Sequence, residues 1–178
     1  MMAMYIAAII GGLTFGSTMK TADLLDEHGL KWFKGSPILF GFLWGIAGAA
    51  LVSLDAGVAS AVMATILCFL FRFRLDYRNH ALAAGLIILA FILRDRFDLP
   101  ALLSFLAVFS LAGFLRDAVD NRRSKDLIYW LSDLGWYNYA APLAYGICSG
   151  DWLVFLAFSA YALSYSIVKH SAPDVIGR

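Results

Sequence analysis

Acidic and amide side chains form two clusters, each of which follows a long apolar run and repeats at helical spacing. The members are Asp23, Asp26 and Glu27 in the first cluster and Asp117, Asp120 and Asn121 in the second. Residues three and four apart share one face of a helix, so each cluster would present its oxygen atoms together. Oxygen ligands in such numbers suit Mg²⁺ or Mn²⁺ better than zinc. The spacing therefore predicts a site for one or two such cations, with Glu27 and Asn121 as supporting ligands.

Both acidic clusters lie where a nearby positive charge is expected. Each lies at the C-terminal end of an expected helix, where the helix dipole disfavours a carboxylate by about 0.3–1 kcal/mol. A divalent cation would compensate this charge, and so would the neighbouring arginines and lysines. The alternative to a metal site is therefore a solvated, ion-paired surface.

Arginines are dense in the same parts of the chain, and arginine binds phosphate through two parallel hydrogen bonds. The candidate phosphate-binding residues are Arg72, Arg74, Arg78, Asn79, Arg122 and Arg123. The alternative is that these arginines only hold anionic lipid headgroups.

The histidines supply candidates for proton transfer. His28 follows the first acidic cluster and His80 follows the arginines, and an ordinary histidine pKa lies near 6.5. We expect His28 and His80, together with Glu27, to be the catalytic residues if the protein is an enzyme.

The elements that must position these residues are apolar helices. Of the 178 residues, 61% are hydrophobic and only 15% are charged, and the mean hydropathy is +0.75. A soluble domain carries roughly a quarter charged residues, so the composition excludes a soluble or disordered chain. Apolar runs between polar clusters predict seven membrane spans in a single all-α transmembrane domain covering residues 1–178. The spans are Met4–Met19, Pro37–Leu54, Gly57–Phe71, Ala81–Leu93, Leu99–Leu115, Leu134–Ser149 and Trp152–Val168. Since a bilayer core needs about 20 helical residues, we expect the helices to continue into the flanking polar clusters.

The basic residues fix the expected orientation. With seven spans, 12 of the 14 lysines and arginines fall on one side, and only Arg94 and Arg96 fall on the other. The positive-inside rule makes the basic side cytoplasmic. The sequence thus predicts a multi-pass protein of the cell membrane, with its N-terminus outside and its C-terminus in the cytoplasm.

Together these features favour a membrane-embedded enzyme that acts on a phosphate- or diphosphate-bearing lipid at the cytoplasmic interface. The reaction would be Mg²⁺-dependent group transfer or hydrolysis. None of the seven predicted spans has an Asp, Glu, Lys, Arg or His residue at its middle, which disfavours an ion-coupled transporter.

Two other classes stay open. One is a small oligomeric channel or facilitative transporter, and the other is a non-catalytic assembly or receptor subunit. The expected partner is membrane lipid, and the small-residue face of Gly12 and Gly16 is a candidate surface for a homo-oligomer. A net charge of +1 without a basic tract excludes nucleic-acid binding.

Overall fold

The computed structural model is all-helical in its described part, which covers residues 1–30, 32–75, 77–120, 127, 129 and 135–172. Seven helices are described there. They are α1 (Met2–Asp26), α2 (Ser36–Val52), α3 (Ala56–Phe71), α4 (Arg78–Arg94), α5 (Leu99–Asp120), α7 (Tyr137–Ser149) and α8 (Leu153–His170). Each corresponds to one of the seven apolar runs. The expected extension into polar clusters is found in α1, α4 and α5, whereas α2, α3 and α7 do not extend in this way, and α7 has only 13 residues.

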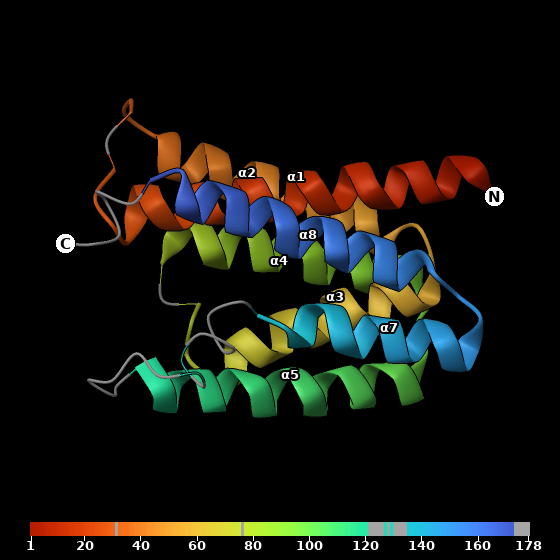
Figure 1. Ribbon diagram of the computed structural model, residues 1–178. Coiled ribbons are helices and arrows are strands. Elements are labelled where there is room, and N and C mark those ends of the chain that lie inside the picture. Colours follow the sequence, from red (N-terminus) through yellow and green to blue (C-terminus); the bar gives the residue numbers. More distant parts are fainter. Residues whose placement is uncertain (31, 76, 121–126, 128, 130–134, 173–178) are drawn as a thin grey trace.

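Helix direction alternates along the chain, as Figure 1 shows. The C-terminal ends of α1, α3, α5 and α8 therefore gather with the N-terminal ends of α2, α4 and α7. We call this the site end, and it lies on the left of Figure 1. At the opposite end, aspartate side chains cap three helices, a common way to satisfy the free N–H groups of a first turn. Asp55 accepts from Gly57 in α3, Asp98 from Ala101 in α5, and Asp151 from Leu153 in α8.

Glycines allow the closest helix contacts. A Cβ atom added at Gly12 or Gly16 of α1 would collide with the carbonyl oxygens of Ala157 or Tyr161 in α8. The two backbones approach here because neither glycine has a side chain. The predicted small-residue face is thus covered by α8 of the same chain, and a homo-oligomer through it stays a prediction.

Three helices, α1, α5 and α8, are long and apolar enough to cross a membrane by length and composition, and α2 and α3 are shorter apolar helices. Less than half of the apolar window of each long helix is buried inside the protein. Large aliphatic side chains therefore remain on the outer surface, such as Ile10 in α1, Leu93 in α4 and Leu111 in α5.

Candidate functional site

A cavity of about 290 Å³ opens within the site end of the bundle. It extends inward from the helix ends to Trp44 of α2, Thr65 of α3 and Phe109 of α5. Its acidic, basic, histidine and tyrosine side chains come from five helices and the adjoining turns. They are Lys20, Asp23, Glu27, His28, Arg72, Arg74, His80, Arg116, Asp117, Tyr137, Tyr161 and Tyr165. Four basic and three acidic side chains leave the cavity with a formal charge of +1 before any histidine is protonated.

Two residues that line the cavity, Asp23 and His80, contact each other. Asp23 lies in the last turn of α1 and His80 in the first turn of α4, and His80 Nε2 lies 2.9 Å from Asp23 Oδ1. Both residues are buried. Asn79 fixes the two helix ends, because its amide donates to the Ala22 carbonyl at 3.2 Å and its oxygen accepts from the His80 N–H at 2.7 Å. The fully buried Asn79 therefore positions the site.

Asp23 also interacts with two other buried side chains. The Tyr165 hydroxyl of α8 donates to Asp23 Oδ2 at 3.2 Å, and Lys20 Nζ lies 3.6 Å from the same oxygen. The Lys20 ammonium also lies 5.3 Å from the centre of the Tyr165 ring. Asp23 thus links α1, α4 and α8.

Glu27 completes a set of side chains that could hold a metal ion. Its Oε1 lies 3.8 Å from His80 Nδ1, and one ligand atom each from Asp23, Glu27 and His80 lie within 4.8 Å of one another. His80 Nδ1 also lies 3.3 Å from the Arg74 carbonyl, the kind of contact that orients a ligating histidine. Two carboxylates and an imidazole fit Mn²⁺ at least as well as Mg²⁺.

Asp117, the first member of the second acidic cluster, has a different environment, because two arginines bind its carboxylate. Arg72 donates from Nε to Asp117 Oδ2 at 2.9 Å and from Nη2 to Oδ1 at 2.7 Å. Arg74 adds a third hydrogen bond to Oδ1 at 2.6 Å. Burial alone would lower the pKa of Arg72, but the hydrogen bonds and charge of Asp117 raise it above the usual value. The Arg72 guanidinium therefore stays charged beside its carboxylate.

His28 lies in the turn that follows α1 and also lines the cavity. Partial burial lowers the pKa of His28, and the positive charge of Lys20 lowers it further. Its imidazole is therefore neutral near pH 7, the form that accepts a proton.

The structure brings together seven of the residues expected from the sequence. Asp23, Glu27, His28, Arg72, Arg74, His80 and Asp117 all line the one cavity. Asp26 and Arg78 do not line it but border a separate, more open depression beside Pro37. Asp120 ends α5, and Asn121, Arg122 and Arg123 lie outside the described residues.

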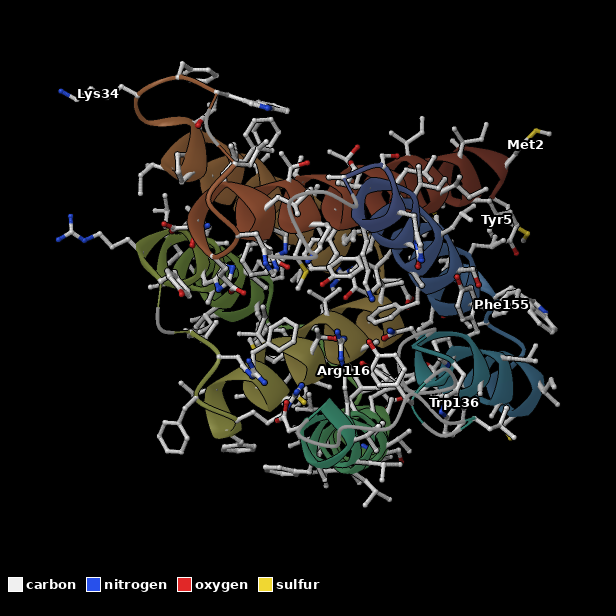
Figure 2. All side chains as sticks on the ribbon, turned by 60° about the vertical axis from the view of Figure 1, so that its left-hand side comes forward. Met2, Tyr5, Lys34, Arg116, Trp136 and Phe155 are labelled. Atoms are coloured by element: carbon white, nitrogen blue, oxygen red, sulfur yellow. The ribbon has the colours of Figure 1, made fainter. Side chains whose placement is uncertain are left out.

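Sequence reasoning did not select Lys20, Trp44 and Arg116 as site residues, although all three line the cavity. Figure 2 shows Arg116 reaching from α5 toward the interior of the bundle. Lys20 could have been selected from the sequence, because it lies three residues before Asp23 and on the same helix face as Gly12 and Gly16. Trp44 lies in an unbroken apolar run and carries no comparable signal.

Comparisons with known proteins gave no match to a protein-family model, a curated protein or a solved structure.

Proposed function

We propose that the chain is a multi-pass protein of the cell membrane with seven spans and the site end in the cytoplasm. Three long apolar helices and the exposed aliphatic side chains on the bundle surface support a lipid environment. The alternation of helix direction supports seven crossings, and the gathering of basic residues at the site end supports its cytoplasmic placement.

With the site end at the cytoplasmic face of the membrane, the protein is an enzyme that acts on a phosphate- or diphosphate-bearing lipid. The observation that carries this proposal is the cavity, because it places buried acids, two histidines and an excess of basic side chains within reach of one ligand. Perturbed ionisable groups that converge in a cleft are typical of catalytic sites. The positive excess favours an anionic substrate over a neutral one.

Each group has a role in this proposal. Asp23, Glu27 and His80 would hold a divalent cation, Mn²⁺ or Mg²⁺, which would neutralise charge on the phosphate oxygens. Neutral His28 accepts the proton of the attacking water or hydroxyl group. Arg72 and Arg74 maintain positive charge at the cavity mouth while bound to Asp117. The reaction is phosphate-group transfer or hydrolysis.

A channel or facilitator finds less support. Beyond Trp44, the described interior consists mainly of buried apolar side chains, including Leu51, Val62 and Ile87. The polar residues of the cavity therefore do not continue as a polar path through the described part of the bundle. A cavity that is closed at its inner end suits binding and chemistry better than conduction.

Turnover by the purified protein in nanodiscs tests the proposal. The substrates are phosphatidic acid and a prenyl diphosphate, with Mn²⁺ or Mg²⁺ present, and product formation is measured by mass spectrometry. We expect turnover of one of them, with a loss of at least about 100-fold in Asp23→Asn and in His28→Asn. Asp26→Asn is the matched control, because Asp26 lies on the same turn outside the cavity. Absence of turnover of both substrates, or full activity in Asp23→Asn, contradicts the proposal, and ion flux into liposomes would then identify a channel.

A further inference from the structure

The indole of Trp44 carries a buried hydrogen-bond donor that has no partner. Trp44 is 1% exposed, lines the cavity, and packs near Phe15 and His80 with ring centroids 6.0 and 5.5 Å away. Among the described residues, its Nε1 has no hydrogen-bond partner. Buried N–H groups are nearly always bonded, so an orphan donor beside a cavity points to an acceptor atom on a ligand.

The Lys20 ammonium faces the same cavity with unused hydrogen-bonding capacity. It carries three N–H donors, and its side chain is 7% exposed. Its 3.6 Å contact with Asp23 Oδ2 is an ion pair that is too long for a good hydrogen bond. Among the described residues, no hydrogen bond from this ammonium is found. Both donors lie close to the contacting pair Asp23 and His80, Lys20 beside Asp23 and Trp44 beside His80.

The arginines at the mouth are less available to a ligand. Arg72 and Arg74 direct three short hydrogen bonds to one carboxylate, Asp117. A ligand anion would have to displace that carboxylate to gain the same bonds. Trp44 and Lys20 require no such exchange, so they are better placed to receive an anion.

The depth of Trp44 limits the shape of the ligand. Trp44 lies eight residues after the start of α2, roughly 12 Å into the bundle. Beyond it the interior is filled by fully buried apolar side chains, among them Phe15, Leu51 and Val62. A group that reaches this point must be the end of its molecule, because no second substituent can continue past it.

We propose that the inner end of the cavity is a binding site for a terminal phosphate, whose oxygens accept hydrogen bonds from the Trp44 indole and the Lys20 ammonium. The inference deepens the proposed function and rests on it in one respect, that the cavity takes a phosphate-bearing molecule. A phosphate monoester of a lipid and free phosphate share this chemistry. A phosphodiester does not, because both of its esterified oxygens lead to further groups.

Nuclear magnetic resonance of the ¹⁵N-labelled tryptophan indoles tests the site directly. The Trp44 signal is identified by its loss in Trp44→Phe or, if that variant does not fold, by elimination with phenylalanine at the other four tryptophans. The full-length protein is titrated with inorganic phosphate. It is also compared in nanodiscs that contain phosphatidic acid, phosphatidylglycerol or phosphatidylcholine alone.

We expect a saturable shift of the Trp44 signal with inorganic phosphate if free phosphate is the ligand, or with phosphatidic acid alone if a lipid monoester is. Lys20→Gln, followed by the Trp44 signal, and Trp44→Phe, followed by the thermal shift with phosphate, should each weaken binding by about tenfold or more, since each removes a bond to a charged group. Trp152→Phe, at the opposite end, should leave affinity unchanged. A Trp44 signal that moves in neither condition, or equally with phosphatidylglycerol, overturns the inference.

The result is separable from the test of the proposed function. Phosphate binding, detected as a thermal shift without movement of the Trp44 signal, refutes this site and leaves the enzyme proposal standing. Movement of the signal in a protein without turnover supports the site and refutes the enzyme proposal.

Discussion

Replacing Asp117 with asparagine should destabilise the protein through the arginine that it leaves behind. The Arg72 side chain is 8% exposed and directs two hydrogen bonds to the Asp117 carboxylate. The guanidinium cannot lose its proton, so without the carboxylate it remains as a nearly buried charge. Arg74 cannot take over, because it carries the same charge.

The size of the effect follows from burial. Breaking a fully buried ion pair costs about 3–5 kcal/mol. The Asp117 side chain is 27% exposed and asparagine retains one acceptor, so we expect a loss of about 2 kcal/mol in the free energy of unfolding. For a chain of this length that corresponds to a fall in Tm of about 4–8 °C. Arg72→Met should cost less, because Arg74 still pairs with Asp117 at 2.6 Å.

Thermal unfolding of the detergent-purified protein in metal-free buffer measures these differences. Arg74→Met serves as the control, since its side chain is 55% exposed and a surface pair contributes about 0–1 kcal/mol. Unchanged Tm in Asp117→Asn, or a larger loss in Arg72→Met than in Asp117→Asn, would refute the reasoning. Either result would return Asp117 to the list of candidate metal ligands.

Three further predictions concern other parts of the molecule. Saturating Mn²⁺ at 100 times its Kd should stabilise the wild type by about 2.7 kcal/mol, measured as a rise in Tm that is lost in Asp23→Asn and kept in Asp26→Asn. Gly12→Ala should destabilise by about 1–3 kcal/mol because its Cβ meets the α8 backbone, whereas Gly85→Ala, with open space around it, should be neutral or stabilising by thermal unfolding. Burial and the charge of Asp55 raise the pKa of Asp151, so the folded state binds its proton more tightly than the unfolded state does. The contribution of Asp151 to stability therefore falls as pH rises above its ordinary value near 3.8, and Asp151→Asn, which can still cap α8, should gain stability relative to wild type between pH 4 and 7. A Tm difference that does not change with pH would contradict this sign.

The sequence predicts the helices, and it predicts that the candidate residues lie at one end of the bundle, because both follow from the local pattern of apolar runs and polar clusters. Apolar runs between polar clusters gave seven helices, and alternation then brings Asp23, His80, Arg72 and Asp117 to one end. Which residues of an acidic cluster line the cavity cannot be predicted from the local sequence, because it depends on how the helices pack. Asp26 and Glu27 both lie on the face of Asp23, yet the packing of α4 and α8 against α1 leaves Asp26 outside the cavity. Likewise, the bond from Tyr165 to Asp23 joins residues 142 positions apart.

The two acidic clusters look equivalent in the sequence, but their compensation differs. Both lie at helix C-terminal ends, where the dipole is unfavourable for a carboxylate. Asp117 is compensated by two guanidinium groups, which hold their protons and form short bonds, so its oxygens are already satisfied. Asp23 instead faces an imidazole at the positive N-terminal end of α4 and an ammonium at 3.6 Å. An imidazole can exchange its proton or bind a cation near neutral pH, whereas a guanidinium cannot. We therefore propose that Asp23 takes part in the chemistry of the cavity and that Asp117 stabilises its mouth.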